Sequence, residues 1–385
     1  MAETRRLYYE DVHQREFVSR VTECRQQDDG YEILLEESAF YPEGGGQPSD
    51  TGSLNGIQVL QVMEKDGSLI HFTKEPVPAG TLAEGRIDWE RRFDLMQQHS
   101  GEHMVSGLVH KTFGYDNVGF HMGRDVITID FNGMLTEADL LSVESEVNRE
   151  IWKDSEIKIY YPSEDELKTL AYRSKKALSG KVRIVEFPGV DICACCGTHV
   201  THTGEIGMVK ILSAVKFRTG VRVEMICGGR VLDYLRMLGE QNHSISVALS
   251  AKPEETAKAV LRLQEEISDL HARIEQVEKD QFEAEVGRWR GKGKALIFKK
   301  NLTPLQIQKL TDAVMKACGG RCGVFSESPD GTFKYAIGKE NGDLRDLVRR
   351  MNASLNGRGG GKPFFAQGSL SAKEEEIRKF FEAEA

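Results

Sequence analysis

The chain has 385 residues and a formal net charge of −9, and its length predicts two or three domains. It contains no apolar run of membrane-spanning length and no secretory signal at its start, so we expect a cytoplasmic protein without membrane contact. Its seven cysteines are odd in number and three of them cluster, which argues against a disulfide framework and favours a reducing compartment.

The hydrophobic pattern along the chain predicts an α+β fold in four parts. A small β-rich, barrel-like domain is followed by an α+β domain, a helical coiled-coil connector and a basic C-terminal α/β domain. Their expected bounds are 1–90, 91–235, 236–285 and 286–385. The elements expected within them are strands at 31–35, 126–131, 182–187, 295–298, 322–326 and 334–337, and helices at 90–113, 137–152, 231–249, 304–317 and 344–355, the last ending in a glycine-rich loop.

A glycine-rich stretch, residues 38–52, follows the first predicted strand. It contains three consecutive glycines, Gly44, Gly45 and Gly46, which permit left-handed backbone angles and let the chain lie close to a ligand. A tight turn between two strands would use the same residues. On the sequence alone, both interpretations stay open.

Two pairs of metal-binding residue types lie further along the chain. His99 and His103 are spaced i, i+4 in a predicted helix, so both imidazoles lie on one helical face. Cys195 and His199 form the second pair, in a turn-like stretch rich in glycine and cysteine. Imidazoles combined with a thiolate favour zinc, and we predict one Zn²⁺ per chain.

The residues leave three questions about this site open. Four protein ligands would close a tetrahedron, as in structural zinc sites, whereas a hydrolytic zinc keeps one position open. Cys193 or Cys196 could replace Cys195 as the thiol ligand. With Glu102, the histidine pair also matches the H-x-x-E-H pattern of zinc metallopeptidases, in which the glutamate is the general base. The absence of a matching downstream carboxylate cluster disfavours that interpretation.

A heptad stripe occupies the predicted connector, after a helix start at Pro253. Its apolar residues recur at alternating spacings of three and four: Val260, Leu263, Ile267, Leu270, Ile274 and Val277. Branched residues at a and mostly leucine at d favour a parallel two-stranded coil, so we predict a homodimer through Val260–Val277. The alternative is that the stripe packs within one chain against the helix at 231–249.

Positive charge is concentrated near the C-terminus. Residues 286–362 carry 16 Lys/Arg against 6 Asp/Glu, a balance of +10, so the rest of the chain carries −19. A basic domain on an acidic protein is typical of a phosphate-binding surface, although a solvated surface without a partner would look the same. A smaller basic cluster lies at 173–183. We predict nucleic-acid contacts at Arg173, Lys175, Lys176, Arg288, Arg290, Lys292, Lys294, Arg358 and Lys362.

Together, these motifs resemble the editing half of alanyl-tRNA synthetase, and most closely the long form of the free-standing alanyl-tRNA editing proteins. The resemblance is carried by the two ligand pairs and by Phe40-Tyr41, Gly45-Gly46-Gln47, Asp50-Thr51-Gly52, Thr219–Glu224 and Gly228-Gly229-Arg230. Gly359–Pro363 and Ala366–Gly368 are similar to the glycine-rich end of the synthetase's DHH-associated C-terminal domain. Two positions depart from the family pattern: Ser38, where threonine is usual, and Cys196, where glycine is common.

The resemblance implies a trans-editing hydrolase that deacylates mischarged tRNA(Ala) without ATP. Its expected substrates are Ser-tRNA(Ala) first and Gly-tRNA(Ala) second. Zinc on His99, His103, Cys195 and His199 would orient the substrate or activate a water.

Other residues of the motifs have expected roles in the same site. Gly45 and Gly46 would offer backbone N–H groups near the ester, and Gln47 and Ser38 would take part in recognition. Glu102 would act as a base or support a ligand. The peptidase, and a zinc-stabilised RNA-binding protein without catalysis, stay open as alternatives.

Overall fold

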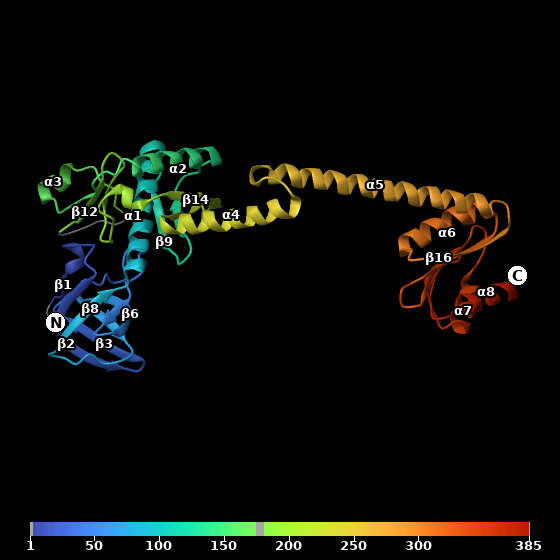
Figure 1. Ribbon diagram of the computed structural model, residues 1–385, viewed down its shortest axis with the longest axis horizontal. Coiled ribbons are helices and arrows are strands. Elements are labelled where there is room, and N and C mark those ends of the chain that lie inside the picture. Colours follow the sequence, from blue (N-terminus) through green and yellow to red (C-terminus); the bar gives the residue numbers. More distant parts are fainter. Residues whose placement is uncertain (1–2, 175–180, 385) are drawn as a thin grey trace. The chain divides into compact units, whose positions relative to one another are not determined.

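The computed structural model describes residues 3–174 and 181–384. The chain divides into two compact units, Met1–Ser244 and Ile245–Ala385 (Figure 1). Each unit has its own clusters of buried hydrophobic side chains. Among the described residues, no helix combines the length and the apolarity needed to cross a bilayer.

A closed six-stranded barrel begins the first unit. In barrel order its strands are β2 (Glu16–Gln27), β3 (Gly30–Leu35), β7 (Ser68–Thr73), β6 (Ile57–Lys65), β5 (Gly52–Leu54) and β8 (Leu82–Ile87). Neighbouring strands are antiparallel, and their inward side chains form one cluster around Ile33, Leu54 and Val62. Outside the barrel, β1 (Arg5–Arg6) pairs with β4 (Glu37–Ser38), and the 3-10 helix η1 (Leu7–Tyr9) follows β1.

Helix α1 (Trp89–Phe113) follows the barrel, as the sequence predicts. It begins at Asp88, whose side chain accepts a hydrogen bond from Arg91 N, and ends at the left-handed Gly114. Every residue from 95 to 109 is buried, because helices and strands from several parts of the unit pack against α1. It therefore presents polar side chains to the interior of the protein.

Two sheets and three helical segments follow α1 in this unit, and strands of both sheets contact it. The four-stranded sheet has the order β14 (Val209–Phe217), β15 (Gly220–Cys227), β10 (Ile127–Phe131), β9 (Asn117–Met122). The three-stranded sheet has the order β11 (Lys158–Tyr160), β12 (Ile184–Phe187), β13 (Asp191–Ala194). The helical segments are α2 (Glu137–Ile151), α3 (Glu164–Thr169) and η2 (Thr203–Ile206). Helix α4 (Gly229–Leu249) follows β15 and the short η3 (Pro253–Glu255) comes next.

The second unit joins a long helix, α5 (Thr256–Trp289), to a five-stranded sheet. The sheet order is β16 (Lys294–Lys300), β17 (Arg321–Glu327), β18 (Phe333–Lys339), β20 (Phe365–Leu370), β19 (Gly357–Lys362). The other α-helices of the unit are α6 (Pro304–Cys318), α7 (Arg345–Ser354) and α8 (Glu374–Ala383). β16 and β17 are parallel, because α6 connects them, and the other pairs are antiparallel.

The heptad stripe of α5 is exposed. Its six apolar side chains are 38–55% exposed, and only Ala259 and Glu285 are buried in this helix. The rest of the unit therefore leaves the stripe uncovered.

One prediction for this unit is wrong. The glycine-rich segment after α7, expected to be a loop, is the edge strand β19. A Cβ atom at Gly361 would lie 2.3 Å from Phe365 O, so the absence of a side chain permits the close pairing with β20.

Candidate metal centre

The four predicted ligands meet in the first unit. His99 and His103 come from one face of α1, and Cys195 and His199 from the turn after β13. Their ligand atoms all lie within 4.8 Å of one another. Cys195 Sγ is 3.5 Å from His99 Nε2 and 3.4 Å from His199 Nε2, which fits the roughly 3.3–3.7 Å edges of a tetrahedral zinc site. The donor set and its spacing therefore suit zinc.

Each histidine is oriented through its other ring nitrogen. The Nδ1 contacts are His99 with Gln47 Oε1 at 2.9 Å, His103 with Asp191 Oδ2 at 3.0 Å, and His199 with Ser100 Oγ at 3.2 Å. Gln47 belongs to the turn Gly44–Gln47, called the glycine loop below, whereas Asp191 lies in β13 and Ser100 in α1 itself. A partner on Nδ1 fixes the ring and leaves Nε2 for the metal, as is usual around protein-bound zinc.

Asp191 connects His103 to Arg173. The Arg173 guanidinium donates to both Asp191 oxygens at 2.7 Å, and the carboxylate is almost fully buried. Although burial by itself raises its pKa, hydrogen bonds from His103 and Arg173 lower the pKa of Asp191 to about 2. The close approach depends on Gly107 of α1, where a Cβ atom would lie 2.6 Å from Asp191 Cβ.

Gln47 connects the glycine loop to the ligands. Its fully buried side chain donates from Nε2 to Thr198 Oγ1 at 2.7 Å, and its Oε1 accepts from Thr198 N at 3.1 Å. The same oxygen faces His99 Nδ1. Gln47 therefore holds a ligand of α1 and the backbone of the Cys195–His199 turn in one network.

The protonation states of Cys195 and His199 favour metal binding. Although burial raises it, the neighbouring His99 and His199 hold the pKa of Cys195 well below its ordinary value. Burial lowers the pKa of His199 to about 3, so this ring is neutral at pH 7. Thiolate and neutral imidazole are the forms that bind zinc.

The three clustered cysteines occupy different positions. Cys195 joins the histidines, Cys193 is buried beside His103 and Asp191, and Cys196 is exposed. The fold thus brings the Cys195 thiol to the histidine group, and it brings Cys193 to a second, adjacent group.

The turn Cys195–His199, called the ligand turn below, is held by side chains that lie outside the two ligand pairs. Arg183 donates from Nη1 to Cys195 O at 2.7 Å and to Gly197 O at 3.0 Å, and the Tyr9 hydroxyl donates to Cys196 O at 2.8 Å. The Arg183 guanidinium also lies over the Tyr9 ring, 4.8 Å from its centroid. These contacts fix the turn independently of a metal.

A cavity of about 650 Å³ opens onto the ligands. Its walls come from the glycine loop, α1, β9, β13 and the ligand turn; they are Gly45, Gly46, His99, Glu102, His103, Val118, Gly119, Phe120, Arg173, Ser174 and residues 193–197. The Phe120 ring stacks on His99 with 5.5 Å between centroids. The cavity is large enough for a nucleoside-sized ligand.

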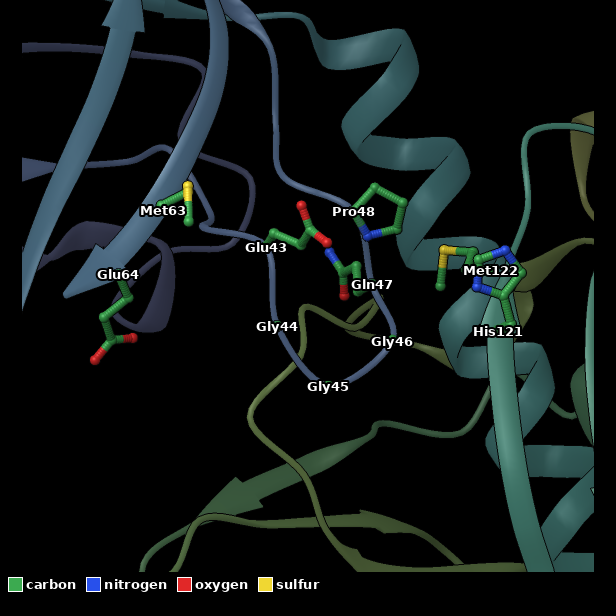
Figure 2. A pocket seen from close by; sticks show the side chains of 10 residues that line it. All are labelled: Glu43, Gly44, Gly45, Gly46, Gln47, Pro48, Met63, Glu64, His121 and Met122. Carbon is green, nitrogen blue, oxygen red and sulfur yellow. The ribbon is translucent and has the colours of Figure 1, made fainter. Parts of the chain in front are cut away.

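The glycine loop separates this cavity from another. Gly44 and Gln47 exchange backbone hydrogen bonds at 3.1 and 3.0 Å, and Gly45 and Gly46 have φ values of +61° and +88°. The loop is therefore both a tight turn and a left-handed glycine segment. The second cavity, about 470 Å³, lies between this loop, Met63 and Glu64 of β6, and His121 and Met122 of β9 (Figure 2). Gly45 and Gly46 line both cavities.

The remaining predicted site residues are Ser38 and the basic residues expected to contact nucleic acid. Ser38 is fully buried in the first unit, with its hydroxyl 2.8 Å from His71 Nε2 and accepting from Phe40 N. Lys175 and Lys176 lie outside the described residues. The predicted basic residues of the second unit are all exposed: Arg288, Arg290, Lys292, Lys294, Arg358 and Lys362.

Sequence reasoning missed Asp191, Ser100 and Arg183 as supports of the centre. Asp191 and Ser100 could have been noticed, because each lies next to a motif and has a polar side chain. Arg183 lies twelve residues before the turn that it holds, and no pattern connects the two.

Two parts of the chain match known domain families. Residues 182–224 match the family described as the threonyl and alanyl tRNA synthetase second additional domain, and residues 291–385 match the DHHA1 domain. The first match lies in the first unit and the second match in the second unit, so both units resemble known domains and the first resembles a domain of aminoacyl-tRNA synthetases.

Relatives that match long parts of the chain show its family. The alanyl-tRNA editing protein AlaX-L of Pyrococcus horikoshii is 30% identical over 97% of this chain and 96% of its own length. The alanyl-tRNA editing protein Aarsd1 of Bos taurus is 32% identical over 66% of this chain and 61% of its own. The alanine–tRNA ligase of Ignicoccus hospitalis is 31% identical over 93% of this chain, but this chain spans only 40% of that ligase. The chain belongs to the alanyl-tRNA editing protein family.

Proposed function

We propose that this protein hydrolyses the ester of mischarged tRNA(Ala), with Ser-tRNA(Ala) as the main substrate and Gly-tRNA(Ala) as a second one. The observation that carries the proposal is the convergence of three oriented imidazoles and one thiol at the wall of a cavity shared with a glycine loop. The names of the relatives supply the class of substrate.

His99, His103, Cys195 and His199 would hold one zinc ion. When bound, zinc supplies either a fixed point that orients the terminal nucleotide or a Lewis acid that activates a water. Gln47, Ser100 and Asp191 hold the ligand rings before the metal binds, which reduces the ordering needed on binding.

The glycine loop would stabilise the developing oxyanion. Gly45 and Gly46 line the cavity without side chains, so their backbone N–H groups can approach an ester closely. Ser38 and Gln47 would influence recognition through the loop that they flank, since both side chains are buried. Glu102, which lines the cavity, would accept the proton of the attacking water.

Selectivity for serine would rest on its hydroxyl. A synthetic site rejects an isostere with an added hydroxyl poorly, whereas a site that hydrogen-bonds this hydroxyl leaves polar groups unpaired when alanine enters. An editing site with that property removes serine and spares the correct product.

The second unit would bind the body of the tRNA and pair two chains. Exposed Lys and Arg residues around β16 and along β19 would contact phosphates. The uncovered stripe Val260–Val277 would form the seam of a homodimer.

An in vitro deacylation assay tests the function. The purified protein, without ATP, is given Ser-tRNA(Ala), Gly-tRNA(Ala) and Ala-tRNA(Ala), and release of amino acid is followed. Rapid hydrolysis of the seryl ester and slow hydrolysis of the alanyl ester are expected. Equal rates on the two would refute an editing role, and cleavage of unmodified peptides in a parallel assay would favour the peptidase.

A further inference from the structure

Glu102 lies in a buried triangle of polar side chains at the cavity wall. Its Oε1 accepts a hydrogen bond from Ser106 Oγ at 2.5 Å and another from Asn117 Nδ2. Asn117 Nδ2 also donates to Ser106 Oγ at 3.1 Å. All three side chains are almost fully buried, and Ser106 lies one turn after Glu102 on α1.

Asn117 is itself held in one orientation. Its Oδ1 accepts from Gly119 N at 3.1 Å, so the amide presents its NH₂ group to Glu102 and Ser106. Asn117 begins β9, the strand that supplies Gly119 and Phe120 to the cavity. The orientation of Glu102 is thus coupled to a strand that lines the same cavity.

The second carboxylate oxygen faces the metal side of the site. Glu102 Oε2 is 3.9 Å from His103 Nε2, the nitrogen that is left for the metal because Nδ1 is engaged by Asp191. Two donors on Oε1 prevent rotation of the carboxylate, so Oε2 keeps this position.

We propose that Asn117, with Ser106, is a positioning residue that holds Glu102 so that Oε2 accepts the proton of the attacking water. This inference rests on the proposed function. The water oxygen bonds to the ester carbonyl carbon while its proton passes to Oε2. The bond from that carbon to the ribose oxygen then breaks, and the ribose oxygen takes the proton from Glu102. The products are the free amino acid and tRNA with a free hydroxyl.

A double-mutant cycle on the full-length, zinc-loaded protein tests this coupling. Glu102→Gln should lower kcat for Ser-tRNA(Ala) roughly 10²- to 10⁴-fold, as expected for loss of a proton acceptor. Asn117→Ala should lower kcat roughly 10- to 100-fold with KM nearly unchanged, because it misplaces the base without removing it. The double variant should be no slower than Glu102→Gln alone, because Asn117 acts only through Glu102.

Zinc content and thermal unfolding are measured on every variant, so that the result does not depend on activity alone. Both single variants should keep about one zinc per chain. Asn148→Ala is the matched control, since Asn148 is a buried asparagine whose side chain bonds to the backbone of Val209 and Glu144, away from the cavity. It should lower the melting temperature and leave kcat within about twofold.

Three results would overturn the inference. Multiplying effects in the double variant would mean that Asn117 acts independently of Glu102. Loss of zinc in Glu102→Gln would make Glu102 a ligand. An Asn148→Ala variant as slow as Asn117→Ala would make the effect structural. If Asn117→Ala does not fold, Ser106→Ala, which removes the other donor, takes its place in the cycle. A wild-type protein without deacylase activity would instead refute the proposed function itself.

Discussion

The two longest helices of the protein carry opposite patterns. α1, with 25 residues, buries Gln, His, Ser and Glu side chains, whereas α5, with 34 residues, exposes a row of aliphatic ones. Buried polar groups and exposed apolar stripes are both unusual, so each requires a specific partner. For α1 the partners lie in the same unit and complete the candidate metal centre. For α5 the rest of its unit leaves the stripe uncovered, and the partner proposed above is the same helix of a second chain.

The largest expected effect tests the buried helix. His103→Ala removes an oriented ligand, so the protein should lose most of its zinc and its deacylase activity. Metal content by mass spectrometry or atomic absorption checks this result. His110→Ala, an exposed histidine in the last turn of the same helix, is the control and should keep about one zinc per chain. Retention of full zinc in His103→Ala would contradict the ligand assignment.

A smaller loss of zinc affinity is expected when a histidine ligand stays in place but the side chain that hydrogen-bonds to its Nδ1 is changed. Asp191→Asn removes the carboxylate behind His103, and zinc affinity should fall roughly 10- to 100-fold. Competition with a chelator of known affinity measures the change. Asp130→Asn is the control, because Asp130 also pairs with an arginine, Arg222, but away from the ligands. Equal affinities in the two variants would show that Asp191 does not tune the centre.

The second unit should dominate binding to the tRNA backbone. Replacing Arg290, Lys292 and Lys294 by alanine should reduce the salt slope of tRNA affinity by about 2, since each phosphate contact contributes roughly 0.7–0.9. Binding measured over a salt series tests this. Lys153, Lys168 and Lys216, also exposed, form a charge-matched control. If both triple variants lower the slope equally, the basic surface near β16 has no special role.

The smallest effect on stability is expected on α5. Ile267→Glu should convert a dimer into a monomer in sedimentation experiments, while changing the stability of one chain by no more than about 0.5 kcal/mol, because the side chain is exposed. Leu261→Glu is the control, because Leu261 is also exposed but lies off the stripe. The sedimenting mass of this variant should equal that of the wild-type protein. A wild-type monomer would remove the second-chain interpretation of the stripe.

Periodic elements could be predicted from the sequence. The helices expected at 90–113, 137–152, 231–249 and 304–317 are confirmed within two residues, because hydrophobic spacing and caps define them locally. The prediction of a loop over the glycine-rich segment of β19 is wrong, because glycine indicates a loop and a tightly paired edge strand equally well.

The sequence by itself determined the family, the four candidate ligands and the glycine loop, because residue types at fixed spacing carry that information without a fold. Only the tertiary structure decided what holds each ligand. Gln47, Asp191 and Ser100 are 52, 88 and 99 residues from the imidazoles that they contact. Such contacts depend on strands and helices packing side by side, and no local pattern records which polar groups will then be close enough to bond.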